Sequence, residues 1–161
     1  MSHRHTYAIT TTWTGNRGEG TSGYRAYGRD HDLDAVGRPT LPASSDPAFR
    51  GDPERWNPEL LLVAALSDCH LLAYLHLCAV NGVVVTGYTD DAEGTMEQIG
   101  DGGHFTGVVL RPRVTVADAD MITAANALHE EAHRRCFIAA SVVFPVRTEA
   151  TATVERTAAV D

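Results

Sequence analysis

The stretch "NPELLLVAALSDCHLLAYLHLCAVNG", residues 57–82, decides the fold. Asn57 suits the N-cap of a helix, and Pro58 suits its first turn. Asn81 and Gly82 form a suitable end, which leaves a helix of about 23 residues and roughly 35 Å. Leucines lie on nearly every side of this helix, so we expect it to be buried on most of its surface. A chain of 161 residues is small for burying so long a helix, which favours a dimer with paired central helices.

Length and composition narrow the class of protein. A chain of 161 residues corresponds to about one domain, and 43% hydrophobic residues suffice for a core, so we predict a single domain over residues 1–161. The formal net charge of −8 and the scattered basic residues argue against a nucleic-acid partner. Residues 1–13 lack the apolar run of a signal sequence, and no segment has about 18 uninterrupted apolar residues. We therefore expect a cytoplasmic protein without a membrane partner.

Short strands are predicted before the helix. Residues 6–13 and 24–36 are rich in β-branched and aromatic residues around a turn, which predicts a meander of two or three strands. Residues 37–56 are rich in Pro, Gly and Ser, and Phe49 and Trp56 are large apolar side chains that can anchor them. We predict an ordered surface loop there.

Further strands and a second helix are predicted after residue 82. Residues 83–98 and 104–116 predict a β-hairpin across the turn "IGDGG". Asp118 or Asp120 can cap a helix through residues 121–136, and residues 141–155 alternate like a final strand. The predicted fold class is α+β, an antiparallel sheet packed on a long buried central helix and a second helix.

The three cysteines are an odd number, which argues against a structural disulfide framework. Cys69 and Cys78 are nine residues apart and lie about 180° apart around the helix, so they do not pair with each other. Cys78 has apolar neighbours and is predicted to be an inert core thiol. Cys69 stands in "SDCH", the polar interruption of the apolar helix, and either packs there or has a chemical role.

Residues 57–70, "NPELLLVAALSDCH", with "AHRRCFIAASVVFPV" at residues 132–146, resemble the OsmC/Ohr family of thiol-dependent organic hydroperoxide reductases. The family pattern is a helix that opens with Asn-Pro-Glu, a cysteine ten residues after that glutamate, and a second cysteine after a second helix. Glu59, Cys69 and Cys136 stand at these positions. The resemblance covers about residues 5–155 and implies an OsmC-like, intertwined homodimer that uses no cofactor and no metal.

The resemblance also implies the activity. The Cys69 thiolate would attack the peroxide bond of an organic hydroperoxide and become a sulfenic acid, while an alcohol is released. Cys136 would then form a disulfide with Cys69, which a small or protein-bound dithiol reduces. An arginine supports the thiolate in the family and is held by the glutamate, here Glu59. Arg29 is our choice from its place in the early β region; the alternatives are Arg25, Arg38, Arg50 and Arg55.

The spacing of Glu59 and Cys69 along the helix limits how Glu59 can act on the Cys69 thiolate. Ten residues of helix separate the two side chains by about 15 Å along the helix axis. Glu59 therefore acts either from the partner subunit or through an arginine that bridges from a loop. Asp68 beside Cys69 and Phe137 after Cys136 depart from the simplest family pattern.

Two other functions compete with this prediction. His129 and His133 fit the H-E-x-x-H pattern of zinc hydrolases, but no histidine follows them as a third ligand, and we interpret the segment as a solvated helix face. The other alternative is a small-molecule or acyl-chain binding protein of the same fold without efficient peroxidase activity.

Overall fold

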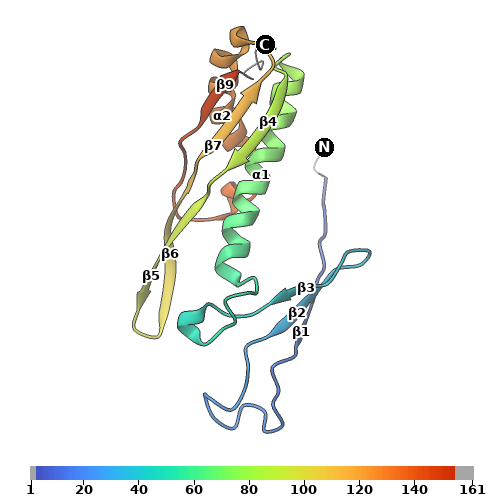
Figure 1. The fold of residues 1–161 in the computed structure, drawn as a ribbon, viewed down its shortest axis with the longest axis vertical. Coiled ribbons are helices and arrows are strands. Elements are labelled where there is room, and N and C mark those ends of the chain that lie inside the picture. The colour runs from blue at the N-terminus through green and yellow to red at the C-terminus, as the bar shows by residue number, and fades with distance from the viewer. Residues whose placement is uncertain (1–2, 155–161) are drawn as a thin grey trace, which may run out of the picture. The chain divides into compact units, whose positions relative to one another are not determined.

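The computed structural model describes residues 3–154, and the chain divides into two compact units. The N-terminal unit ends at Leu61 and the C-terminal unit begins at Leu62. Helix α1 (Pro58–Val80) starts in the first unit and continues through the second (Figure 1). The single domain over residues 1–161 remains a prediction.

The N-terminal unit contains a three-stranded antiparallel sheet in the order β1-β2-β3, with β1 at Thr10–Trp13, β2 at His31–Asp34 and β3 at Leu41–Ala43. The predicted meander is confirmed, although its third strand lies inside the segment predicted as a loop. A 3-10 turn, η1 (Pro47–Phe49), follows.

The segment before α1 is ordered by a buried serine. Ser44 Oγ donates to Asp30 Oδ1 at 3.0 Å and accepts the N–H of Asp52 at 3.1 Å. Trp56, one of the predicted anchors, is 44% exposed. Polar contacts of Ser44 therefore hold this loop where a large apolar anchor was expected.

The C-terminal unit has two sheets and two helices. The sheets have the strand orders β4-β7-β9 and β5-β6-β8. The elements are β4 (Val85–Asp90), β5 (Glu93–Ile99), β6 (Gly102–Leu110), β7 (Pro112–Val116), η2 (Ala119–Met121), α2 (Ile122–Arg135), η3 (Ala139–Ser141), β8 (Val146–Thr148) and β9 (Thr151–Val154). The α+β class is thus confirmed.

The predicted hairpin is present as β5 and β6, which pair antiparallel from Glu93 opposite Val109 to Ile99 opposite Gly102. Gly100 in the turn has a φ of 61°, the left-handed region in which glycine costs least. The predicted sheet is antiparallel, and each sheet of this unit combines an antiparallel pair with a parallel one. β8 pairs parallel to β6, and β9 pairs parallel to β7, because the chain crosses over through α2 before it reaches them.

The last predicted strand is shorter than its alternating pattern. Residues 141–145 contain the end of η3 and a bend instead of a strand, and Pro145 has no N–H to donate to a ladder. Pairing begins at Val146 and is interrupted between Thr148 and Thr151.

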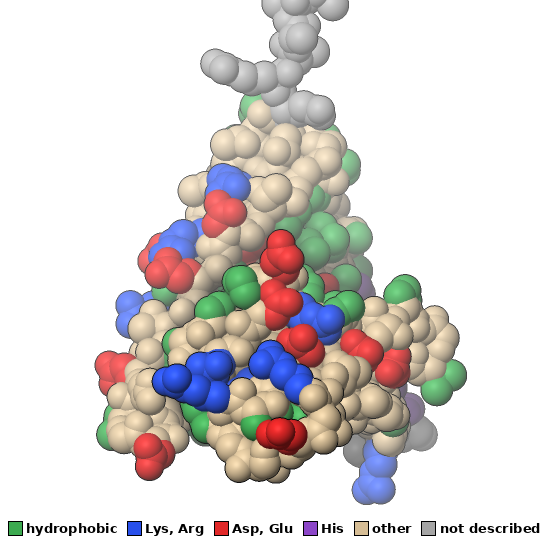
Figure 2. Space-filling model, turned by 60° about the horizontal axis from the view of Figure 1, so that its bottom comes forward, with side chains coloured by type: hydrophobic (Ala, Val, Ile, Leu, Met, Phe, Trp, Pro, Cys, Tyr) green, Lys and Arg blue, Asp and Glu red, His purple; other side chains and the backbone are tan. Residues whose placement is uncertain are grey.

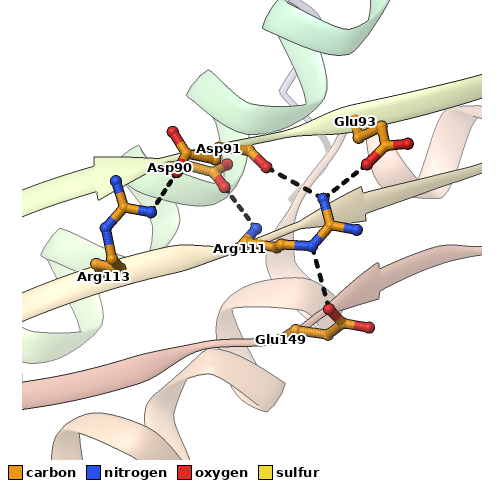
Figure 3. A network of polar contacts seen from close by, with 6 residues as sticks. All are labelled: Asp90, Asp91, Glu93, Arg111, Arg113 and Glu149. Carbon is orange, nitrogen blue, oxygen red and sulfur yellow. Dashed lines mark hydrogen bonds and ion pairs between the residues drawn. The ribbon is translucent and has the colours of Figure 1, made fainter.

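Charged side chains form a network between the end of β4 and the start of β5 and between the end of β6 and the start of β7 (Figure 3). Asp90 Oδ1 accepts the backbone N–H of Arg111 at 2.6 Å, so a carboxylate replaces a ladder acceptor there. The Arg111 guanidinium pairs with Glu93 at 3.0 Å and Glu149 at 3.3 Å, and Arg113 pairs with Asp91. On the face in Figure 2, acidic and basic side chains are interspersed, and hydrophobic side chains reach the surface among them.

Both ends of α1 are capped as the sequence predicts. Asn57 Oδ1 accepts the N–H of Leu60 at 2.8 Å, which satisfies one of the free donors of the first turn. At the other end Gly82 has a φ of 73°, and the N–H of Val83 donates to the carbonyl of Cys78 at 2.9 Å.

Helix α1 is buried along one face only. Its buried residues are Leu66, His70, Tyr74, Leu77 and Cys78, which follow the helical repeat. Leu72 is 60% exposed and Leu75 is 38% exposed. By length and composition the helix can cross a membrane, yet its buried face packs on the sheets and α2 as a core helix does. The expected burial on most sides is therefore not present within a single chain.

Candidate active site

The C-terminal unit brings the thiols of Cys69 and Cys136 together. Cys69 lies in the middle of α1 and is partly buried, while Cys136 is the residue at which α2 ends and is 2% exposed. The two thiols lie close enough for Cys69 to contribute to the raised pKa of Cys136, and both cysteines are free thiols. Residues 67 positions apart in the chain thus meet where α1 packs against the end of α2.

Burial dominates the chemistry of the Cys136 thiol. Burial and, to a smaller extent, the neighbouring Cys69 thiol together raise the pKa of Cys136 to about 11. The backbone N–H groups of Ala139 and Ile138 act in the opposite direction. The N–H of Ala139 donates to Cys136 Sγ at 3.3 Å. Cys136 therefore carries its proton near neutral pH but already has a donor in place for a thiolate.

His70, the residue after Cys69, forms a buried pair with His129. His70 Nε2 and His129 Nδ1 are 3.0 Å apart, and the His129 ring stacks on Tyr74 with centroids 3.9 Å apart. Burial lowers the pKa of His70 to about 4. The negative charge of Asp90 acts in the opposite direction, and His133 makes a smaller lowering contribution. Burial lowers the pKa of His129 to about 4, and the neighbouring His70 makes a smaller contribution in the same direction. Both rings are neutral near pH 7.

The interpretation of His129 as a surface residue is wrong, because His129 is only 4% exposed. Ala125, His129 and Ala132 form the buried stripe of α2 at the helical repeat. The small alanines on either side were the available signal. Around them the expected solvated face is present, since Arg134 pairs with Glu130 and Glu131 at 2.6 Å.

The zinc pattern has no support from the geometry. Within residues 3–154, no group of three or more His, Cys, Asp or Glu side chains is arranged to hold a metal ion. The Nδ1 atom of His129 is engaged by His70, and His133 is the only other histidine of the pattern.

Glu59 and Arg29 both belong to the N-terminal unit. The Glu59 Oε2 atom is buried and accepts no hydrogen bond from a described residue. The Arg29 guanidinium donates to the carbonyls of Tyr27 at 2.7 Å and Tyr24 at 2.9 Å and lies over both rings. Neither side chain forms an ion pair within residues 3–154. The predicted pairing of Glu59 with an arginine is therefore not present among the described residues of a single chain.

The two other predicted features of the helix have clear positions. Cys78 is buried beside Tyr74, and burial raises its pKa, as expected for an inert core thiol. Asp68 is exposed, so the carboxylate that departs from the family pattern faces solvent. Phe137, which follows Cys136, is 81% exposed.

A cavity of about 550 Å³ lies between α2 and the strands β8 and β9. His129, Glu130 and His133 line it on the helix side, and Val146, Thr148 and Ala152 line it on the strand side. Its lining contains neither Cys69 nor Cys136. The cavity has both polar and apolar lining residues, and none of them comes from α1.

Comparison with known proteins agrees with the fold. A family model described as OsmC-like protein matches residues 51–151. An OsmC-like protein of unknown function from Vibrio cholerae is similar over 91% of this chain and 99% of its own, with 32% identity and a TM-score of 0.81. No curated protein matches the sequence.

Two more distant structures have the same fold. An organic hydroperoxide resistance protein from Elizabethkingia anophelis is 19% identical over 96% of this chain and 100% of its own, with a TM-score of 0.69. An organic hydroperoxide resistance protein from Legionella pneumophila is 18% identical over 95% of this chain and 100% of its own, with a TM-score of 0.68.

Proposed function

The chain belongs to the OsmC-like protein family, and from this premise we propose that it is a thiol-dependent peroxidase that reduces organic hydroperoxides to alcohols. The observation that carries the proposal is the proximity of the Cys69 and Cys136 thiols, which are close enough for Cys69 to contribute to the raised pKa of Cys136. The two similar proteins described as organic hydroperoxide resistance proteins support the substrate class.

The reaction uses both thiols in turn. The Cys69 thiolate attacks one oxygen of the peroxide bond, the bond breaks, and the alkoxide leaves and takes a proton to become the alcohol. Cys69 is then a sulfenic acid. The sulfur of Cys136 attacks the sulfur of that sulfenic acid, water leaves, and the Cys69–Cys136 disulfide forms. A dithiol reductant, small or protein-bound, restores both thiols and is itself oxidised to a disulfide.

The burial of the two thiols supports this division of roles. Cys69 is partly exposed and so is accessible to a substrate, whereas Cys136 is 2% exposed. The raised pKa of Cys136 keeps it protonated near neutral pH, so that it does not compete for peroxide as a thiolate. It reacts once Cys69 beside it has become an electrophile.

We assign Arg29 to the support of the Cys69 thiolate and Glu59 to the orientation of the arginine, both from the resemblance to the family. Glu59 supports this role because its buried Oε2 has no partner within the described part of the chain. The position of Glu59 about 15 Å along α1 from Cys69 favours its action in the site of a second subunit.

A second copy of the chain is the partner that we propose for α1. Exposed leucines on this helix, Leu60, Leu72 and Leu75, leave an apolar surface that a homodimer buries. Pairing of α1 with its copy also places Glu59 of one subunit near the site of the other. We propose a cytoplasmic location, in which the three thiols stay reduced.

The second candidate function is the binding of a small molecule or acyl chain without efficient peroxidase activity. The cavity of about 550 Å³ between α2 and β8–β9 favours it, because its size is that of a small-molecule site. In that case the contact of the two thiols has no catalytic use.

Counting thiols separates the two functions. The protein is treated with one equivalent of cumene hydroperoxide, and the free thiols are titrated after denaturation. If the protein is a peroxidase, it loses two of its three thiols within one turnover. The Cys78→Ser control has only two thiols and loses both. Cys69→Ser loses none. If the wild-type thiols remain unchanged, the peroxidase proposal is wrong and the binding function stands in its place.

A further inference from the structure

The sulfur of Cys136 lies in a turn that holds a donor toward it. The N–H of Ala139 donates to Cys136 Sγ at 3.3 Å. Cys69 differs, because it lies inside α1, where backbone N–H groups are already paired along the helix. One of the two facing sulfurs therefore has a backbone donor in place for a negative charge.

The turn that holds this donor is fixed in the reduced protein. The N–H of Ala140 donates to the carbonyl of Cys136 at 3.1 Å, and the N–H of Ser141 donates to that of Ile138 at 3.0 Å. Ile138 and Ala139 pack against the buried cluster of Leu66, Val108 and Leu110. Because the donor is ordered before any charge forms, little reorganisation is needed when a thiolate appears there.

The two sulfurs of a disulfide are not equivalent toward an attacking thiolate. The attacked sulfur must be reached by the reductant, and the other sulfur leaves as a thiolate whose stability affects the rate. Cys136 is 2% exposed and Cys69 is partly exposed, so access favours attack on Cys69. Attack on Cys69 also releases the thiolate of Cys136, which meets the N–H of Ala139. Burial raises the pKa of Cys136, which disfavours it as a leaving group, and the Ala139 N–H offsets part of that effect. Access therefore decides the direction, and the Ala139 N–H makes it feasible.

We propose that the reductant attacks Sγ of Cys69, so that Cys136 leaves as a thiolate stabilised by the Ala139 N–H and the mixed disulfide forms on Cys69. This inference rests on the proposed function for the disulfide itself. The reductant's sulfur bonds to Cys69 as the Cys69–Cys136 bond breaks, and the electron pair of that bond goes to Cys136. A second thiolate then attacks the reductant's own sulfur and releases Cys69 as a thiolate.

The direction of attack is read from the mixed disulfide. The wild-type protein is oxidised with diamide, which forms the disulfide without a hydroperoxide, and is then mixed briefly with glutathione. The reaction is quenched with acid, free thiols are alkylated, and peptides are identified by mass spectrometry. We expect glutathione on the Cys69 peptide and the alkyl group on the Cys136 peptide. Glutathione on Cys136, or equally on both peptides, overturns the inference.

A variant tests the role of the donor. Ala139→Pro removes the N–H, and we expect reduction of the disulfide by glutathione to slow about tenfold, the effect of losing one hydrogen bond to a charged atom. Ala139→Gly keeps the N–H and is the matched control, with a rate near that of the wild type. An unchanged rate in a folded Ala139→Pro protein contradicts the role of the donor. The location of glutathione on the Cys69 or Cys136 peptide is determined in the wild-type protein and does not depend on this variant. Because diamide makes the disulfide, failure of the peroxidase proposal appears separately, as a lack of reaction with hydroperoxide.

Discussion

His70 Nε2 lies 3.0 Å from His129 Nδ1, so a buried hydrogen bond joins α1 to α2 at the residue that follows Cys69. Of the two facing nitrogens, one donates and the other accepts when both rings are neutral. The outer nitrogens, His70 Nδ1 and His129 Nε2, are buried without a partner among the described residues. A proton added to either ring has no new acceptor there, which is why burial holds both pKa values at about 4.

The first prediction is that acid destabilises the protein through these rings. A histidine in the unfolded chain has a pKa near 6.5, and each ring has a pKa of about 4 in the folded protein. Between these values the unfolded chain binds more protons, so stability is full above about pH 6.5 and falls as the pH approaches 4. One ring accounts for roughly 3 kcal/mol of the free energy of unfolding by pH 4. Urea unfolding between pH 7 and pH 4 measures this loss.

His129→Gln and His76→Gln distinguish the buried pair from other groups that titrate in this range. His76 is exposed, so its replacement should leave the pH dependence as in the wild type. His129→Gln removes one of the two buried rings and should flatten the decline in stability between pH 6.5 and 4. A decline as steep in His129→Gln as in the wild type would show that the pair does not control it.

The second prediction concerns Arg29, whose guanidinium donates to the carbonyls of Tyr27 and Tyr24 at the same time. Lysine keeps the charge but lacks the planar set of donors, so Arg29→Lys loses this fixed orientation. We expect the oxidation of Cys69 by cumene hydroperoxide to slow about tenfold, as for the loss of one hydrogen bond to a charged group. Stopped-flow measurement of that step, at a concentration well below saturation, gives the rate.

Arg25→Lys is the matched control, because Arg25 is an exposed arginine of the same segment. Its rate should equal that of the wild type. Equal rates in Arg29→Lys and Arg25→Lys would remove Arg29 from the site and return the assignment to the other arginines, Arg38, Arg50 and Arg55.

The sequence was sufficient for the features that depend on local rules. The caps of α1 at Asn57 and Gly82 follow from residues within one turn of each end. The β5–β6 hairpin follows from alternating residues on both sides of Gly100. Each of these needs contacts between near neighbours only, which is why pattern and spacing predict them.

The features that the sequence missed depend on contacts between distant segments. Nothing near His129 identifies His70, 59 residues earlier, as its partner, and a histidine in a charged segment resembles a surface residue. The parallel pairing of β8 with β6 depends on the path of the chain through α2. The contact of Cys69 with Cys136 was expected only from the resemblance to a family, because helix spacing says nothing about the packing of one helix on another.

The third prediction tests the second copy of the chain on α1. Leu72 is 60% exposed on this helix, and Leu72→Glu places a charge in the apolar surface that a homodimer would bury. We expect the wild type to be a dimer at micromolar concentration by light scattering, and Leu72→Glu to be a monomer. Val143→Glu replaces an exposed apolar residue outside α1 and should remain a dimer. A monomeric wild type would contradict the proposed pairing.

The last prediction separates the two thiols by what each does in one turnover. Cys136→Ser keeps a hydroxyl of similar size at the end of α2 but leaves Cys69 without a partner for a disulfide. We expect this variant to consume one equivalent of hydroperoxide at the wild-type rate, because the first step needs only Cys69, and then to stop turning over with the dithiol dihydrolipoamide. The sulfenic acid on Cys69 should accumulate and react with dimedone, which mass spectrometry detects on the Cys69 peptide. Cys78→Ser should turn over normally, since burial raises the pKa of that thiol and keeps it in the core. Full turnover by Cys136→Ser, or dimedone on the Cys78 peptide, would show that the contact between Cys69 and Cys136 is not the redox pair.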